Sequence, residues 1–168
     1  MSYHRCDGTA GSAAEKRQRA GFSGKKKRHT LKVQYVIGPD GRIYDVSATY
    51  PGKIHDFNVY KKQKKRNRFH WIPKKADSGY QGINRFDSNA EIPFQKPKNG
   101  RLTPEQKAYN RELSKKRIKV ENVIGETKIF KILSNVYRNR RRDHNIKTNI
   151  IAGIINMKNE KRNMKEAA

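Results

Sequence analysis

The order of hydrophobic and polar positions predicts a β-hairpin in the first third of the chain. Apolar residues alternate with Lys32 and Gln34 over positions 30–37, which is the period of a half-buried strand. Positions 38–41 (GPDG) have strong turn chemistry, and positions 42–49 are rich in β-branched and aromatic residues. The two segments are therefore expected to pair as neighbouring antiparallel strands.

Shorter elements are predicted in the middle of the chain. Asp56 is a good N-cap for a short helix, and the basic run at 61–68 that follows is expected to be a solvated loop. A short strand is expected at 71–76, although Pro73 weakens it. This strand would lead directly into Asp77.

Two longer helices are predicted in the second half. Thr103 is an N-cap, Pro104 takes the first helical position and Gln106 completes a capping box. The helix that begins there has one apolar face, with spacings of four, seven and four residues, formed by Tyr109, Leu113, Val120 and Ile124. A last helix at 143–158 carries an apolar stripe with further isoleucines beside it: Ile146, Ile150, Ile154 and Met157, then Ile151 and Ile155.

The charge of the chain predicts a polyanionic partner. There are 40 Lys and Arg residues against 15 Asp and Glu, which gives a formal charge of +25 and a pI near 10.4. Such a charge repels itself unless a polyanion compensates it, and the usual polyanion is nucleic acid. An acidic small-molecule substrate would not need it. With 168 residues, one domain with a small core is expected.

Cysteine usage and the lengths of apolar runs predict the compartment. Cys6 is the single cysteine of the sequence, so a disulfide within it and the usual zinc spacings are excluded. The most apolar segment, 150–157, is far too short to cross a bilayer, and positions 1–15 have no apolar stretch of signal-peptide length. We therefore expect a cytoplasmic, nucleoid-associated protein with no membrane partner.

Three acids stand apart from those that simply neighbour a base. Asp7 precedes Gly-Thr, Asp77 precedes Ser-Gly-Tyr, and Glu121 is expected in mid-helix. Arg117 and Lys128 share the face of Glu121, because one is a helical turn away and the other seven steps of about 100° away. Taken alone, an Arg-Glu pair at this spacing is commonly a surface ion pair, and an Asp before Ser-Gly is commonly a turn residue.

Together with the stretches around them, these acids carry a resemblance to a known family. The stretches are 7–9 (DGT), 23–30 (SGKKKRHT), 55–56 (HD), 76–82 (ADSGYQG), 117–125 (RIKVENVIG) and 137–142 (YRNRRR). They occur in the family's order and cover most of positions 7–156. The sequence resembles the catalytic part of a DDE transposase of the insertion-sequence-five group, which is related to the Harbinger transposases and to the DDE superfamily endonucleases.

The resemblance implies an α/β fold of the ribonuclease-H-like type, a mixed sheet with flanking helices. In that fold the first two aspartates lie on or just after strands and the glutamate comes from a helix. Matched motif by motif, Asp7, Asp77 and Glu121 take the catalytic and metal-binding places. In the family's C-terminal signature of Tyr, Arg, Glu and Lys, Arg117 and Lys128 fit, whereas Ser114 takes the place of the Tyr.

The implied activity is that of a transposase catalytic fragment, which cleaves phosphodiester bonds and transfers strands of an insertion sequence. Two Mg²⁺ or Mn²⁺ ions would activate the attacking oxygen and stabilise the leaving one. Hard cations take oxygen ligands, so carboxylates are the right residue type for this chemistry. Metal would also relieve the repulsion among the three acids and between the acids and DNA phosphates.

Basic residues around these motifs are expected to contact DNA. Arg117 and Lys128, beside Glu121, are placed as phosphate clamps. His29, His55 and His144 are further candidate phosphate donors. Two runs are expected to contact phosphates, the first of them with a solvated strand end as the alternative: Lys25, Lys26, Lys27 and Arg28, then Arg138, Arg140, Arg141 and Arg142. Asp56 keeps two interpretations, a helix cap and an approach to the metal site.

The expected organisation has three parts: a loop-like N-terminal segment, 1–24, that carries the first Asp; a catalytic domain, 25–158; and a basic tail, 159–168. The family's N-terminal end-recognition domain is expected to be absent. Expected partners are double-stranded DNA (transposon ends and target), a DNA-binding part from an upstream reading frame, and further copies of the chain in a homo-oligomer. The alternatives are a catalytically inactive remnant of a decayed copy and a non-enzymatic basic nucleic-acid-binding protein, which the charge alone favours.

Overall fold

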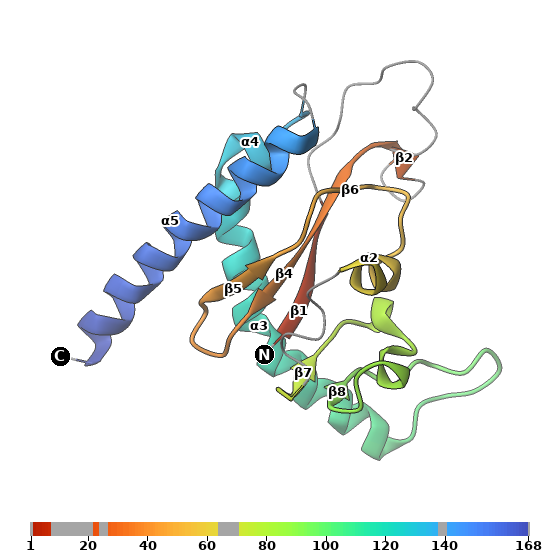
Figure 1. Cartoon of the computed structure of the whole chain (residues 1–168). Helices are drawn as coiled ribbons and strands as arrows, with labels where there is room; N and C mark the ends of the chain where they lie inside the picture. Colours follow the sequence, from red (N-terminus) through yellow and green to blue (C-terminus); the bar gives the residue numbers. More distant parts are fainter. Residues whose placement is uncertain (1, 8–21, 24–26, 64–70, 138–140, 168) are drawn as a thin grey trace.

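A computed structural model describes the chain over residues 2–7, 22–23, 27–63, 71–137 and 141–167 (Figure 1). Its centre is a six-stranded mixed sheet with the order β5-β4-β1-β7-β8, in which β6 also pairs with β4. The strands are β1 (Ser2–Asp7), β4 (Leu31–Ile37), β5 (Ile43–Val46), β6 (Tyr50–Pro51), β7 (Lys74–Lys75) and β8 (Ala90–Glu91). The pairs of β4 with β1, β5 and β6 are antiparallel, whereas β1 with β7 and β7 with β8 are parallel. The mixed α/β class predicted from the sequence is confirmed.

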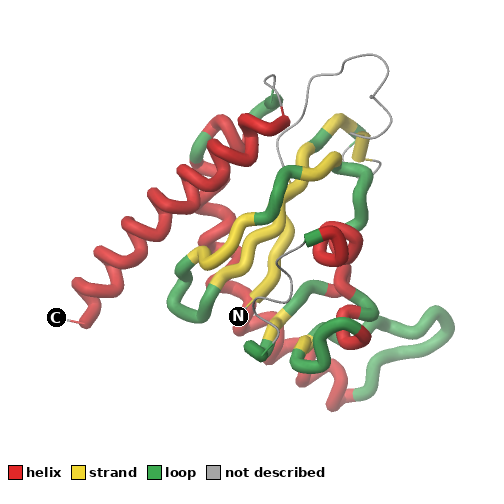
Figure 2. The backbone as a smooth tube through the Cα atoms, in the orientation of Figure 1, coloured by secondary structure: helices red, strands yellow, loops and turns green. Residues whose placement is uncertain are grey.

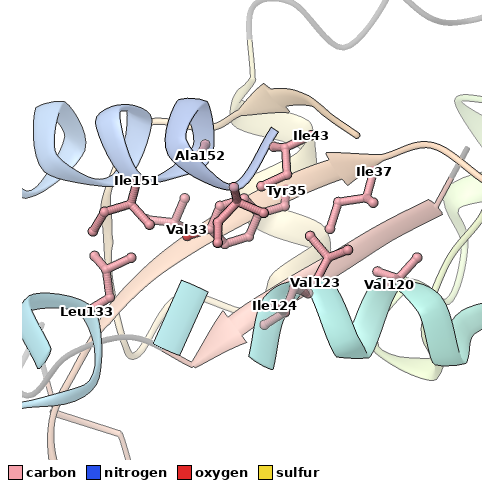
Figure 3. Close-up of a cluster of buried hydrophobic side chains, with 11 residues drawn as sticks. Val33, Tyr35, Ile37, Ile43, Val120, Val123, Ile124, Leu133, Ile151 and Ala152 are labelled. Carbon is pink, nitrogen blue, oxygen red and sulfur yellow. The ribbon is translucent and has the colours of Figure 1, made fainter. Parts of the chain in front are cut away.

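Helices cover both faces of this sheet (Figure 2). One face packs on α3 (Pro104–Ile129), α4 (Lys131–Ser134) and α5 (Arg141–Ala167), and the other on α2 (Asp56–Lys62) and two short 3-10 turns, η2 (Ser78–Tyr80) and η3 (Ile83–Arg85). Figure 3 shows the first apolar core, where β4 and β5 meet the three C-terminal helices. The second core is smaller and is formed by Val36, Tyr60, Ala76, Tyr80, Ile83 and Ala90.

The predicted hairpin is present. Gly41 takes the left-handed conformation (φ +82°) that the GPDG turn requires of a glycine, and its N–H donates to the carbonyl of Gly38 at 3.0 Å. β4 is not half-buried as expected, because helices cover both of its faces and strands flank both of its edges. Lys32 and Gln34 are consequently buried, at 4% and 2% exposure.

Helix α3 confirms the capping prediction in detail. The Thr103 hydroxyl accepts from the Gln106 N–H at 3.3 Å, and the Gln106 side chain accepts from the Thr103 N–H at 3.1 Å. Leu113, Val120 and Ile124 are buried on its inner face. The helix continues through Gly125 to its end at Ile129 without interruption.

Helix α5 is longer than the predicted helix and includes most of the expected basic tail. Asn156 both accepts from the Ile43 N–H (2.7 Å) and donates to the Ile43 carbonyl (2.9 Å), so α5 covers the free edge of β5. Asn159 and Asn163 donate to the carbonyls of Gly41 and Asp40, which holds the end of the helix on the hairpin turn. The buried face is that of Ile151 and Ile155, whereas Ile146, Ile150, Ile154 and Met157 are exposed.

Three local expectations differ from the structure. Asp56 is not the N-cap of α2: His55 takes that place, and Asp56 is the first helical residue, with its carboxylate buried. The strand expected at 71–76 is reduced to β7, as Pro73 and the neighbouring lysines suggest. Within the segment expected to be loop-like, 1–24, the structure has strand β1 and a two-residue strand β2 (Phe22–Ser23), which pairs with β3 (Arg28–His29).

Candidate active site

The first two predicted acids belong to adjacent parallel strands. Ser2 of β1 pairs with Lys75 of β7. Asp7 is the last residue of β1, and Asp77 follows β7 by two residues. Both acids therefore lie towards the carboxyl ends of neighbouring strands that run in the same direction. The backbone of Asp7 is placed in the sheet opposite Lys32, and its side chain lies outside the described part of the structure.

Asp77 is held by the turn that follows it. Its Oδ1 accepts the N–H of Ser78 at 2.6 Å and the hydroxyl of Ser78 at 3.3 Å, so that it caps the 3-10 turn η2. The interpretation of Asp77 as a turn residue is therefore correct. The side chain is 41% exposed, which leaves the carboxylate accessible for a further ligand.

Arg117 joins the second and third predicted acids. One terminal nitrogen, Nη1, lies 3.4 Å from Asp77 Oδ1, and the other, Nη2, lies 3.5 Å from Glu121 Oε1. Helix α3 supplies both Arg117 and Glu121, whereas Asp77 comes from the loop after β7. Arg117 is mostly buried (11% exposed) and Glu121 is exposed (56%). Two carboxylates that lie 44 residues apart in the sequence thus meet at one guanidinium.

The remaining predicted DNA contacts are distributed over several elements. Lys128 is exposed in the last turn of α3, seven residues beyond Glu121 on the same continuous helix. Lys27 and Arg28 are exposed at the start of β3, shortly before Lys32, the register partner of Asp7. Arg142 is exposed on α5 and pairs with Asp143 at 3.4 Å. The remaining members of the two runs lie outside the described side chains and stay predictions: Lys25, Lys26, Arg138, Arg140 and Arg141.

His144 is not available as a phosphate donor. It is buried (2% exposed), and its Nδ1 lies 3.1 Å from the Thr49 hydroxyl and 3.3 Å from the Thr148 hydroxyl. Burial, and secondarily the charge of Lys147, lowers the pKa of His144 to about 4. The imidazole is therefore neutral at physiological pH and holds α5 against the strand region, which corrects the sequence prediction.

Asp56 lies near the candidate site in a role that neither sequence interpretation described. Its Oδ1 is 3.5 Å from Lys32 Nζ, and both side chains are largely buried. Lys32 also donates to the carbonyl of Ile54. On its other side, the Asp56 carboxylate packs against Gly79, two residues after Asp77. Sequence reasoning missed Lys32 and Gly79, because one looked like a solvated strand position and the other like part of a turn.

The described residues supply two of the three carboxylates that the resemblance assigns to metal. Asp77 and Glu121 offer hard oxygen donors of the type that Mg²⁺ and Mn²⁺ prefer, and both contact the guanidinium of Arg117. Asp7 would be the third ligand. Among the side chains that the structure describes, no cluster of three metal-ligating residues occurs. The two described carboxylates match a divalent cation in the type of their donor atoms.

Comparison with known proteins identifies the family of the chain. The sequence model of the DDE superfamily endonuclease family matches residues 7–159. The chain is 46% identical over 143 residues to a probable transposase for insertion sequence element IS702 from Microchaete diplosiphon, a match that covers 84% of this chain and 51% of the relative. The chain thus spans about half the length of this curated relative. No solved structure matches.

The fold and the site define a mixed α/β protein in which a helix glutamate and a post-strand aspartate share one arginine. The chain belongs to the DDE superfamily endonucleases, as a relative of insertion-sequence transposases. The family predicted from the sequence motifs is confirmed.

The helices in the described ranges were also considered as membrane spans. None of them combines the length and the apolar character needed to cross a bilayer.

Proposed function

We propose that this chain is the catalytic part of a DNA transposase of the insertion-sequence-five group, and that it cleaves phosphodiester bonds and transfers strands with two divalent metal ions. The observation that carries the proposal is the contact of Arg117 with both Asp77 and Glu121. A surface ion pair of the ordinary kind would involve Glu121 alone. The additional reach to Asp77 supports a shared site for the second and third acids.

We propose further that the fold is of the ribonuclease-H-like type. Support comes from the places of the three acids: Asp7 ends β1, Asp77 follows β7, and Glu121 lies on α3. These are the places that the resemblance assigns to them. The sheet supports the same view, since three antiparallel strands continue into two parallel ones at β1.

In the proposed site, Asp7, Asp77 and Glu121 would hold two Mg²⁺ or Mn²⁺ ions, which would activate the attacking oxygen and stabilise the leaving oxygen. The Ser78 N–H fixes the orientation of the Asp77 carboxylate through its 2.6 Å hydrogen bond. When no metal is bound, Arg117 neutralises the charges of Asp77 and Glu121. When these carboxylates bind metal, the Arg117 guanidinium is free to bind a phosphate of the DNA. Its planar guanidinium suits this exchange, because it matches carboxylates and phosphates equally well.

Double-stranded DNA, as transposon ends and target, is the proposed substrate. The formal charge of +25 supports it, and so do the exposed basic residues Lys27, Arg28, Lys128 and Arg142. A DNA-binding part from an upstream frame, a homo-oligomeric active form and association with the nucleoid belong to the same proposal.

DNA binding is expected to depend steeply on salt. If about eight phosphates are neutralised, log K should fall against log salt with a slope of roughly −7, because each contact releases counterions. A filter-binding titration on two unrelated duplexes measures the slope and the sequence preference. Replacing Arg142 together with Arg140 and Arg141 should weaken both duplexes alike, since phosphate contacts carry no sequence information. A slope near zero would contradict the electrostatic account.

Nicking of supercoiled plasmid tests the enzymatic part of the proposal. Cleavage should require Mg²⁺ or Mn²⁺ and stop when a chelator is added. Asp77→Ala and Glu121→Gln should each abolish it and leave DNA affinity equal or slightly higher, because each removes a metal ligand and a negative charge that faces phosphate. Glu112→Gln is the matched control, as Glu112 lies on the same helix but is exposed and pairs with Lys115.

The outcomes separate the candidate functions. Metal-independent cleavage, or full activity of Asp77→Ala, would refute the assignment of the acids. Tight DNA binding without any cleavage by the wild type would favour an inactive remnant or a non-enzymatic binding protein.

A further inference from the structure

Lys32 and Asp56 form a buried ion pair between β4, which pairs with the strand of Asp7, and α2, which contacts the turn after Asp77. Lys32 lies on β4 at the register position opposite Asp7, and the alternation of the strand places it away from the core of Val33 and Tyr35. Its ammonium group contacts Asp56 Oδ1 at 3.5 Å, with side-chain exposures of 6% and 12%. Lys32 also donates to the carbonyl of Ile54, just before α2. The strand is therefore tied to the start of that helix.

The other side of Asp56 meets the loop that carries Asp77. A Cβ added to Gly79 would lie 3.2 Å from Asp56 Oδ2, which is closer than ordinary van der Waals contact. The Asp56 carboxylate therefore packs closely against the backbone of Gly79. Since Ser78, the residue between, donates its N–H to Asp77, the position of Asp56 is linked to that of Asp77 through three consecutive residues.

The sheet alone does not fix the distance between the two strand ends. In the described residues, the register of β1 with β7 consists of the pair Ser2 and Lys75, at the opposite end of β1 from Asp7. β7 itself has only two residues. A buried ion pair can restrain the distance between these strand ends, because each of its charges is strongly destabilised when the partner moves away.

We propose that Lys32 and Asp56 are positioning residues whose ion pair sets the separation between Asp7 and Asp77. The path runs from Asp7 to Lys32 by strand register, from Lys32 to Asp56 by charge, and from Asp56 to Asp77 by the contact with Gly79. Metal ligands must be held at a defined spacing, and residues outside the coordination sphere commonly provide that restraint. The inference rests on the proposed function, because it assumes that the two aspartates bind metal.

Mn²⁺ binding to the protein without DNA, followed by the spin resonance signal of the free ion, tests the inference without relying on activity. Asp56→Asn removes the charge and keeps the shape, and Gly79→Ala pushes on the carboxylate without removing any charge. Both should weaken Mn²⁺ binding about tenfold. DNA affinity by filter binding should stay within about twofold, since neither residue belongs to the basic runs.

Controls distinguish positioning from stability. Leu133→Ala opens the apolar core on α4, far along the chain from the site, and should lower the melting temperature with no change in Mn²⁺ affinity. If Asp56→Asn fails to fold, Gly79→Ala still provides the measurement. Unchanged Mn²⁺ affinity in Asp56→Asn and Gly79→Ala would overturn the inference and assign the pair a structural role alone.

The Mn²⁺ measurement also distinguishes failure of the proposed function from failure of this inference. Asp77→Ala should remove Mn²⁺ binding outright if Asp77 is a ligand. Binding that survives Asp77→Ala would overturn both the proposed function and this inference. Binding that is lost in Asp77→Ala but unchanged in Asp56→Asn would overturn the inference alone.

Discussion

The two faces of the sheet bury different kinds of side chain. On the side of α3 and α5 the core is almost entirely aliphatic, with Tyr35 as its large aromatic member. On the side of α2 the sheet buries two ion pairs, Lys32 with Asp56 and Lys74 with Asp87, beside a smaller apolar cluster. Aliphatic packing stabilises a fold without fixing one geometry tightly, whereas buried charges hold their partners in defined places.

The proposed acids lie at the boundary between the aliphatic side and the side with buried ion pairs. Asp77 follows β7 and lies two residues before Gly79, against which the Asp56 carboxylate packs. Glu121 comes from α3, on the aliphatic side, and Arg117 reaches from there to Asp77. The candidate site therefore lies where the two layers meet. One layer supplies a stable platform, and the other supplies the restraint on position.

The largest effect is expected from breaking the Lys74–Asp87 pair. Both side chains are almost fully buried (0% and 2% exposed), and the Tyr60 hydroxyl also donates to Asp87 at 3.3 Å. Lys74→Met should lower the free energy of unfolding by about 3–5 kcal/mol, because it leaves an uncompensated buried carboxylate. Urea denaturation measures the loss.

The double variant Lys74→Met/Asp87→Leu is the control for that measurement. It should recover most of the loss, since replacing a whole buried ion pair with apolar residues is often neutral or stabilising. If the double variant were as unstable as Lys74→Met, the loss would come from altered packing and not from an unpaired charge. The two faces of the sheet would then differ less than the account proposes.

A smaller effect is expected from His144, the buried polar residue on the side of α5. Its pKa of about 4 in the folded chain lies below the ordinary value of 6.5, because burial disfavours the charged form. The unfolded chain therefore binds more protons between these two values, and stability falls as the pH decreases through this window. At pH 5 the loss relative to pH 7 should be roughly 2 kcal/mol.

Urea denaturation at pH 7 and at pH 5 measures this loss in the wild type and in His144→Gln. The variant should be less stable at pH 7, because Thr49 loses its contact with the ring nitrogen, but it should lose less stability on acidification. An equal pH dependence in both proteins would show that other groups cause it.

Much of the fold was predictable because its signals are local. The GPDG turn, the capping box at Thr103 and the last helix each depend on signals within a few residues, and all three are present. The last helix buries Ile151 and Ile155, however, and not the stripe that the period singled out. The burial of Lys32 and Asp56 was not predictable in this way. Their partners lie far away in the sequence, and a lysine at an alternate strand position looks solvated until the layer that covers it is known.

In the candidate site, too, the local features were predictable and the contacts between distant elements were not. Helix geometry predicted the pair of Arg117 with Glu121, and the family motifs singled out Asp77. The contact between Arg117 and Asp77 depends on how α3 crosses the end of β7, which no spacing in the sequence encodes. The catalytic roles of Asp7, Asp77 and Glu121 stay predictions.

The most direct test of the central claim, that Asp77 is a metal ligand for DNA cleavage, is a change of metal preference in Asp77→Cys. A thiolate is a soft ligand that binds Mg²⁺ poorly and softer cations well. The variant should be inactive in plasmid nicking with Mg²⁺ and partly active again when the softer Cd²⁺ is supplied, while Asp77→Ala stays inactive with either metal. Full activity of Asp77→Cys with Mg²⁺, or equal rescue of Asp77→Ala, would contradict the claim.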